Sequence, residues 1–319
     1  MAGKKLPLIN LLLALLVLLC GTQGRAATTA SDAPLVVILI SDLEEAYTAP
    51  VAVFSEQIGM PTAHFNLMGD IDRAPALMAE ILAKKPALIF ALGAKAAYVA
   101  KVWTKDHPDI PVIFAMVVNW ERYNLLAGQN NIAGIASDVD PGTQLANILL
   151  VSSKIKRIGV VYNSEYSETI MDKTRKAAQV LGIDLLEEPI ARPQEFQRAF
   201  KRMIDRIDGF IMLADPVLFT LENVAWLEKR CIRERLVCAG PSENIARLGI
   251  LLSVNPDNAN IGAQAASVAK SILSKKTEPG RIGVMQPLGT RLFLNLKTAS
   301  QIGLAIDQTV VDLASDVIN

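Results

Sequence analysis

The stretch Ile155-Lys-Arg-Ile-Gly-Val-Val-Tyr-Asn163 decides the fold, together with the polar run Ser164-Glu-Tyr-Ser167 that follows it. A charged lead-in runs into a short, β-branched apolar strand, the strand ends at a polar loop, and a helical pattern begins. The chain opens in the same way at Leu35-Val-Val-Ile-Leu-Ile40, which ends in Ser41-Asp42. The sequence therefore predicts two α/β lobes, the second of which starts near the middle of the chain.

Length and composition fit a protein of two well-packed domains. The chain has 319 residues, of which 51% are hydrophobic and 20% are charged. These values favour filled cores and argue against a disordered protein. Because 32 basic residues balance 32 acidic ones, the formal net charge is zero. We therefore expect no nucleic acid as a partner.

Residues 1–26 are predicted to be a secretory signal peptide. Two lysines precede the apolar run Leu8–Leu19, and small residues follow at a suitable cleavage site. Residues 27–34 form a linker, and the mature protein is expected in the periplasm. Two alternatives stay open: an uncleaved anchor, for which the run is short, and a lipoprotein attached through Cys20, which is preceded by a residue that fits a lipobox poorly.

Two cysteines of the mature chain, Cys231 and Cys238, stand across a helix end and the following strand. A disulfide between them is geometrically demanding, so two buried free thiols are the simpler expectation, and both alternatives stay open. Their spacing is not that of a metal site. Since the chain has only two histidines, His64 and His107, no metal is expected.

Strand and helix patterns alternate along both halves of the chain. In the first half, apolar strands are expected over residues 36–40, 64–66, 87–92 and 111–118, with helices over 46–59, 70–85 and 95–105. In the second half, strands are expected over 158–162, 208–213, 236–238, 249–254 and 291–296, with helices over 168–181, 193–207, 220–233 and 260–273. This alternation predicts parallel sheets with right-handed crossovers.

Prolines and a polar turn mark three crossings between the lobes, near residues 137–142, 256 and 279. The predicted fold class is α/β, with two doubly wound parallel-sheet lobes joined by a multi-strand hinge. The expected ranges are 35–138 plus about 257–280 for lobe one, and 139–256 plus about 281–319 for lobe two.

The candidate ligand-binding residues follow from the strand ends, because ligands of open parallel sheets bind beyond the carboxyl ends of the strands. Two lobes made this way would hold one small molecule between them. The expected binding residues are Ser41, Asp42, Gly93, Ala94 and Asn119 in lobe one, and Asn163, Ser164, Tyr166, Asp215 and Ser242 in lobe two.

Each candidate has a chemical role and a plainer alternative. Free N–H groups after Gly93 favour an anion such as a carboxylate, although the segment is equally typical of a βα turn. Ser41 would add a hydroxyl to that anion, or cap a helix. Asp215 would pair with a ligand ammonium, or cap the following helix. Tyr166 and Trp120 would cover an apolar ligand face, or lie as ordinary partly buried surface.

Motifs of catalysis and nucleotide binding are missing from the sequence. No GxGxxG follows the first strand, and neither GxxxxGK[ST] nor GxSxG occurs. The acid pairs Glu44-Glu45 and Glu187-Glu188 are typical of solvated faces, although Glu44 would reach the mouth of the cleft. We therefore expect neither an enzyme nor a cofactor.

The order of elements resembles that of ABC transporter substrate-binding proteins with the type 1 periplasmic fold, including the tryptophan-binding-like components. The resemblance covers about residues 35–304 and also includes the strand that ends at Asn163. Its most specific part is C-terminal and consists of Gly262-Ala-Gln-Ala-Ala266, Ile272-Leu-Ser-Lys275, Gln286-Pro287, Leu294-Asn-Leu-Lys-Thr-Ala299 and Ile302-Gly-Leu304.

The resemblance implies a cleft that closes on one small molecule, often an amino acid or a related compound. It assigns the ligand carboxylate to Ser41, Gly93, Ala94 and Asn119, with closure from lobe two by Asn163, Tyr166 and Asp215. The implied partner is an ABC permease of the inner membrane, and we expect a monomer. Two alternatives remain: a periplasmic sensor that docks to a membrane receptor kinase or cyclase, and an exported α/β enzyme.

Overall fold

The computed structural model describes residues 33–215 and 217–319. The expected signal peptide, most of the expected linker and Cys20 lie outside the described residues. Within the described residues, no helix has the length and apolar character needed to cross a membrane.

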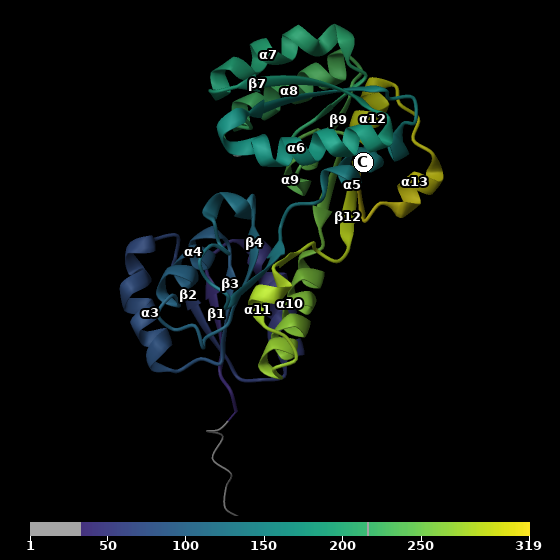
Figure 1. Ribbon diagram of the computed structural model, residues 1–319. Helices are drawn as coiled ribbons and strands as arrows, with labels where there is room; N and C mark the ends of the chain where they lie inside the picture. Colours follow the sequence, from purple (N-terminus) through teal and green to yellow (C-terminus); the bar gives the residue numbers. More distant parts are fainter. Residues whose placement is uncertain (1–32, 216) are drawn as a thin grey trace, which may run out of the picture. The chain divides into compact units, whose positions relative to one another are not determined.

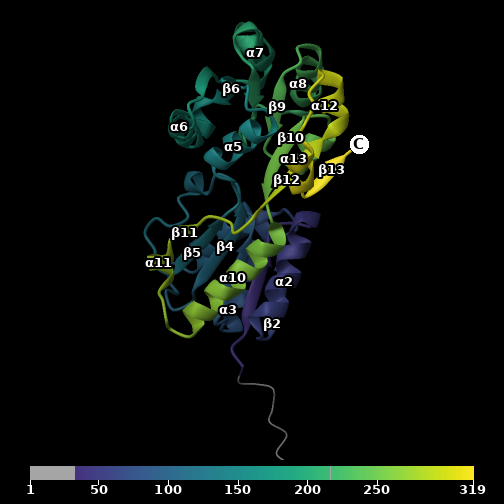
Figure 2. The ribbon, with the colours of Figure 1, turned by 90° about the vertical axis from the view of Figure 1, so that its right-hand side faces the viewer.

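The first sheet has six parallel strands in the order β11-β5-β4-β3-β1-β2 (Figures 1 and 2). Its strands are β1 (Val36–Ile40), β2 (Thr62–Asn66), β3 (Leu88–Leu92), β4 (Val112–Val117), β5 (Ile132–Ala136) and β11 (Val284–Met285). The elements that accompany it are η1 (Glu45–Tyr47), α2 (Thr48–Ile58), η2 (Ile71–Arg73), α3 (Ala74–Ala83), α4 (Ala94–Trp103), η3 (Trp120–Tyr123), α10 (Asn258–Leu273) and α11 (Pro279–Ile282).

Helices cover both faces of this sheet, which explains why its central strands are apolar without alternation. In β1, Val36 and Ile38 belong to the core formed with α2 and α10. Val37 and Leu39, which point the other way, belong to the core formed with α3 and α4. Figure 2 shows α2 and α10 lying side by side on the first of these faces.

The second sheet has seven strands in the order β13-β12-β10-β9-β8-β6-β7. Its strands are β6 (Arg157–Asn163), β7 (Asp184–Ile190), β8 (Gly209–Ile211), β9 (Val237–Gly240), β10 (Leu252–Pro256), β12 (Thr290–Asn295) and β13 (Asp316–Ile318). The accompanying elements are α5 (Pro141–Val151), α6 (Ser164–Leu181), η4 (Pro193–Glu195), α7 (Phe196–Met203), η5 (Ile204–Arg206), α8 (Leu221–Arg233), α9 (Glu243–Arg247), α12 (Leu296–Ile302) and α13 (Gln308–Leu313).

Two apolar cores also enclose the second sheet. One contains α5, α6, α12 and α13, and the other contains α7 and α8. The predicted α/β class with doubly wound, mostly parallel sheets is confirmed. The short elements α9, α13 and β13 were not predicted.

The chain passes between the two sheets three times. It leaves the first sheet after Ala136, returns after Pro256, and leaves again after Met285. The third crossing comes later than the expected position near residue 280, because β11 pairs with β5 of the first sheet. Strand β12 then enters the second sheet from its carboxyl-terminal edge. This direction makes the β10–β12 pair antiparallel, the exception in a sheet that is otherwise parallel.

The Gly262-Ala-Gln-Ala-Ala266 motif has a structural role at this third crossing. A Cβ at Gly262 would lie 2.4 Å from the Pro50 carbonyl oxygen, so glycine allows α10 to pack against the backbone of α2. The buried Gln264 amide donates to the Gln286 carbonyl at 3.0 Å and accepts from the Leu288 N–H at 3.0 Å. The motif therefore holds α2, α10 and the third crossing together.

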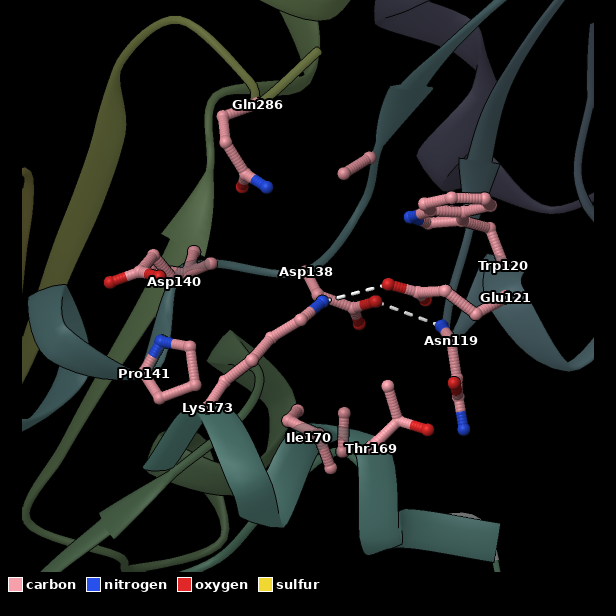
Figure 3. A pocket seen from close by; sticks show the side chains of 13 residues that line it. Asn119, Trp120, Glu121, Asp138, Asp140, Pro141, Thr169, Ile170, Lys173 and Gln286 are labelled. Atoms are coloured by element: carbon pink, nitrogen blue, oxygen red, sulfur yellow. Dashed lines mark hydrogen bonds and ion pairs between the residues drawn. The ribbon is translucent and has the colours of Figure 1, made fainter. Parts of the chain in front are cut away.

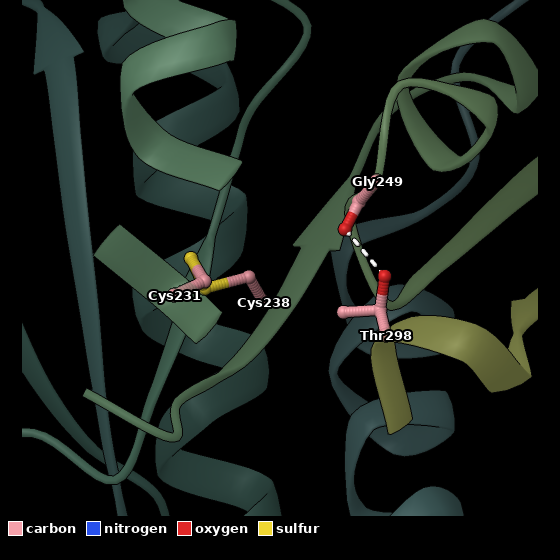
Figure 4. The surroundings of a disulfide bond; sticks show 4 residues. All are labelled: Cys231, Cys238, Gly249 and Thr298. Carbon is pink, nitrogen blue, oxygen red and sulfur yellow. Dashed lines mark hydrogen bonds between the residues drawn. A yellow bond between two sulfur atoms is a disulfide. The ribbon is translucent and has the colours of Figure 1, made fainter. Parts of the chain in front are cut away.

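The second motif, Leu294-Asn-Leu-Lys-Thr-Ala299, attaches α12 to the loop before β10. Asn295 accepts from the Thr298 N–H at 2.9 Å and donates to the Ala246 carbonyl at 2.9 Å. The Thr298 hydroxyl donates to the Gly249 carbonyl at 2.8 Å (Figure 4).

Cys231 and Cys238 form a disulfide (Figure 4). Their Cα atoms lie 6.3 Å apart, and the bond joins the last turn of α8 to β9. Both residues are buried in the core on that face of the sheet. The expectation of free thiols is therefore wrong, because the short turn between α8 and β9 brings the two side chains within bonding reach.

Replacing Gly262 with alanine should destabilise the protein. The added methyl group must displace the Pro50 carbonyl, which we expect to lower the free energy of unfolding by about 1–3 kcal/mol in urea denaturation. Ser267→Ala, at an exposed position of the same helix, is the control, because helix propensity alone makes that change neutral or favourable. Equal stabilisation by both changes would contradict the close packing of α10 on α2.

Removal of the disulfide should also have a measurable cost. The Cys231→Ala/Cys238→Ala double variant should lose about 2–3 kcal/mol, the value expected for so short a loop. Wild-type protein unfolded in the presence of reductant should lose a similar amount. Thiol titration of the denatured, unreduced protein should detect neither cysteine, and detection of both would contradict the bond.

Candidate functional site

A cavity that residues of both sheets line lies where their strands end. It has a volume of about 510 Å³. The first sheet contributes η1, Val118 after β4, and the crossing at Ser137–Val139. The second sheet contributes Pro241–Glu243 after β9 and the start of β12, and Asn255–Ala259 continues from β10 into α10. The cavity therefore lies at the edge at which parallel sheets bind ligands.

A second cavity of about 350 Å³ adjoins the first. Both cavities are lined by Val118, Ala214, Pro241 and Ser242. The second is more apolar, since Tyr123, Leu213, Phe219 and Ile245 also line it. We use the name cleft for these two adjoining cavities.

The backbone at the end of β4 is shaped by two residues in the left-handed region. Met116 has φ 59° at a break in the pairing of β4 with β5, and Asn119 has φ 50°. Asparagine tolerates this conformation, whereas for methionine it is uncommon. Bulges of this kind often redirect side chains beside binding sites. Here the bulge precedes Val118 and Asn119, which both line the cleft.

Three contacts link η3 of the first sheet to α6 of the second. The Asn119 side chain donates to the Tyr166 carbonyl at 2.6 Å, and the Arg122 guanidinium lies 3.9 Å from the centre of the Tyr166 ring. Glu121 and Lys173 form an ion pair at 2.7 Å (Figure 3). We call this set of contacts the η3–α6 bridge.

Asp138 lies beside this bridge, on the first crossing between the sheets (Figure 3). Its Oδ2 accepts from the Asn119 N–H at 2.8 Å. Burial raises the pKa of Asp138 to about 6, an effect that the Asn119 N–H opposes; nearby Glu121 raises the pKa further and Lys173 lowers it. Asp138 thus carries a partly desolvated carboxylate at the wall of the cavity.

The residues expected to bind an anion in lobe one are engaged with one another. The Ser41 hydroxyl accepts from the Ala96 N–H at 3.0 Å, at the start of α4. A Cβ at Gly93 would lie 2.3 Å from the Tyr47 hydroxyl and 2.5 Å from the Ser41 hydroxyl. These two hydroxyls therefore lie over the Gly93 backbone. Burial of the Tyr47 hydroxyl raises its pKa to about 12.

None of the lobe-one residues Ser41, Asp42, Gly93 and Ala94 lines the cleft as we define it. Asp42 instead lines a groove of about 670 Å³ between α2 and β2. Asn119 does line the cleft. Contact of these residues with a ligand stays a prediction.

Asp215 lines the smaller cavity of the cleft, although it is only 3% exposed and accepts four hydrogen bonds within the second lobe. Its Oδ2 accepts from the Asn163 N–H at 2.8 Å and the Ser167 hydroxyl at 2.7 Å. Its Oδ1 accepts from the Val217 and Leu218 N–H groups at 3.0 and 3.1 Å. These bonds account for the burial of the carboxylate without a ligand ammonium.

Of the other lobe-two candidates, Asn163 stabilises the start of α6, whereas Ser242 lines the cleft. The Asn163 side chain accepts from the N–H groups of Glu165 and Tyr166 and donates to the Ala191 carbonyl, so it caps α6. Ser164 is exposed, and Tyr166 takes part in the η3–α6 bridge. Ser242 lines both cavities of the cleft. A ligand contact of these residues likewise stays a prediction.

The polar residues of the larger cavity that sequence reasoning missed include Asp138, Gln144 and Arg291. Asp138 lies two residues after the end of β5, so the rule that ligands bind beyond the strand ends could have found it. The polar turn at residues 137–142, however, indicates only a crossing between the lobes. Gln144 lies one turn inside α5, and Arg291 begins a strand that enters from the shared edge, positions at which the rule gives no signal.

The described residues contain no group of three or more histidine, cysteine, aspartate or glutamate side chains placed to hold a metal ion.

Ionisation of Asp138 should reduce stability. Because the pKa is raised to about 6 from an ordinary value of 3.8, the folded protein binds this proton more tightly than the unfolded chain. The free energy of unfolding should therefore fall as the pH rises from about 4 to above 6. Asp138→Asn should raise it by about 1–3 kcal/mol at pH 7.5 and by little at pH 4.

Urea denaturation at several pH values measures this difference. Asp106→Asn, on an exposed loop, reports the effect of the same chemical change away from the cavity. Loss of stability in Asp138→Asn at pH 7.5 would contradict the assignment.

Comparison with solved structures shows the same fold in several proteins. A conserved domain protein of Vibrio cholerae matches with a TM-score of 0.63 and 20% identity, over 89% of this chain and 99% of that one. The ligand-free, open structure of a substrate-binding protein with adhesive properties from Clostridium difficile matches with a TM-score of 0.76 and 18% identity. The match covers 90% of this chain and 99% of that one.

A third structure, the ABC domain from Streptococcus pneumoniae in complex with L-Trp, matches with a TM-score of 0.63 and 18% identity, over 89% of this chain and 99% of that one. A search of curated proteins found no match. The family model of the ABC transporter substrate binding protein matches residues 60–318. Two α/β sheets with a cavity at their facing strand ends agree with that match, and the chain belongs to the ABC transporter substrate binding protein family.

Proposed function

We propose that the protein is the periplasmic solute-binding component of an ABC importer and that it holds one small molecule in the cleft. The observation that carries this proposal is the cavity of about 510 Å³, lined from both sheets at the carboxyl ends of their strands. Small-molecule sites in proteins have volumes of this order. Membership of the substrate-binding family supports a small-molecule ligand and an ABC permease as the partner that receives it.

An amino acid or a related compound fits the chemistry of the cavity. Arg291 offers a guanidinium for a carboxylate, while Asp138 offers a carboxylate for an ammonium. Apolar side chains such as Val118, Ile170 and Phe293 form much of the remaining wall. A structurally similar ABC domain with bound L-Trp supports a ligand of this size.

Closure of the cleft would occur about the three crossings, which are the only connections along the described chain between the two sheets. Each crossing is short, so rotation there changes few backbone angles. The η3–α6 bridge lies on one side of the cavity and would limit the direction of this movement.

A thermal-shift screen of the purified protein against amino acids, purines, sugars and short organic acids tests ligand binding. At a free ligand concentration of about 100 times Kd, binding adds about 2.7 kcal/mol, which should raise the melting temperature by about 5–10 °C. Ala214→Trp should abolish the shift, because Ala214 lines both cavities of the cleft. Ala83→Trp, at an exposed position on α3, is the matched control.

Small-angle X-ray scattering with the same ligand tests closure. The radius of gyration should fall on ligand addition in wild-type protein and in Ala83→Trp, but not in Ala214→Trp. A shift that Ala214→Trp retains, or a flat screen of the folded protein, would contradict binding in the cleft.

A further inference from the structure

The polar groups that line the larger cavity are strongly unequal in charge. One guanidinium, that of Arg291, lines the cavity. Five carboxylates also line it, those of Glu44, Glu45, Asp138, Glu243 and Asp257. Two of the five are engaged elsewhere, since Glu243 pairs with Arg247 and Asp257 caps α10. Glu44, Glu45 and Asp138 have no ion-pair partner within residues 33–215 and 217–319.

The guanidinium of Arg291 does not neutralise this excess. It lies 5.0 Å from the centre of the Phe293 ring, a cation–π contact. It forms no ion pair with any described carboxylate. One Asp138 oxygen accepts the Asn119 N–H, and no described hydrogen bond engages the other. The cavity wall therefore offers carboxylate oxygens that a cation would satisfy.

A second observation, independent of the carboxylates, points to a ligand in the same cavity. Gln144 of α5 lines it, although the side chain is only 7% exposed. Its Oε1 is buried and has no hydrogen-bond partner within the described chain. A buried amide oxygen without a partner is costly, and buried polar groups in folded proteins almost always have one. A donor on a molecule in the cavity would supply it.

We propose that the cavity selects a small molecule of net positive charge, whose cationic nitrogen faces Asp138 and the η1 glutamates Glu44 and Glu45 while Gln144 accepts a hydrogen bond from it. This inference rests on the proposed binding function and narrows its ligand class. Basic amino acids and small polyamines have this chemistry: each carries several N–H donors and at least one excess positive charge. The single Arg291 would still accommodate one carboxylate.

Isothermal titration calorimetry with matched probes tests the charge requirement. The pairs are L-arginine with its neutral isostere L-citrulline, L-lysine with L-norleucine, and putrescine with 1,4-butanediol, with L-tryptophan, L-leucine and L-glutamate as additional probes. In at least one pair, the cation should bind about tenfold or more tightly than its neutral partner, a difference of about 1.4 kcal/mol. Asp138→Asn and Glu45→Gln should each reduce that preference.

Gln144→Leu tests the second part of the proposal. The variant removes an unpaired buried amide, so the melting temperature of the free protein should stay equal or rise. Affinity for the cationic probe should fall about tenfold or more. Ser253→Ala is the matched control: the Ser253 hydroxyl is also buried without a partner, on β10, but Ser253 does not line the cavity. That control should leave affinity unchanged.

The outcomes separate this inference from the proposed function. Tighter binding of a neutral or anionic probe than of every cation would overturn the charge selection and leave the binding function standing. Unchanged affinity in Gln144→Leu would overturn the role of that amide. Failure of all probes to bind the folded protein would count against both the inference and the proposed function.

Discussion

The three crossings between the sheets are the constraint on which the remaining structure depends. All three lie at the edge where the parallel strands end, after Ala136, Pro256 and Met285. Because the chain must leave and enter each sheet at this edge, the strand-end loops of both sheets face a common space. The same constraint makes β12 antiparallel to β10, since β12 begins at the edge where β10 ends. The binding cavity is thus a consequence of chain connectivity, and Gln264 stabilises that connectivity by holding the third crossing through two hydrogen bonds.

Polar side chains near the cleft fall into two groups with different physical states. Asp215 and Asn163 are buried and use their hydrogen-bonding capacity within the second lobe, so they fix the end of β6 and the start of α6. Asp138 and Gln144 are incompletely satisfied by the protein itself. Satisfied buried networks make a scaffold rigid, whereas unpaired buried groups are retained at a cost that a ligand can offset. The first group of residues therefore holds the backbone of the site in place, and the second group is available to bind the ligand.

Much of the fold was predictable because apolar, β-branched runs and helical patterns alternate from Val36 to Asn295. The short elements α9, α13 and β13 escaped prediction, since their few residues depend on tertiary contacts such as the pairing of β13 with β12. The sequence left open whether Cys231 and Cys238 form a disulfide, because sequence spacing does not give the geometry of a turn. The rule that ligands bind beyond the carboxyl ends of parallel strands found Asn119, Asp215 and Ser242 in the cleft. It did not show that the protein itself already engages the polar atoms of Ser41 and Asp215, because such hydrogen bonds are invisible in a sequence. The rule also could not locate Gln144, which lies within a helix.

The measurement that tests the central claim most directly is hydrogen–deuterium exchange of the purified protein with and without its best-binding ligand. Binding between the sheets predicts added protection in segments from both sides of the cavity: η1, the crossing at 137–140, the start of α5 and the loop after β9. Protection confined to one sheet and its helices, or centred on the groove between α2 and β2, would contradict a ligand site at the facing strand ends.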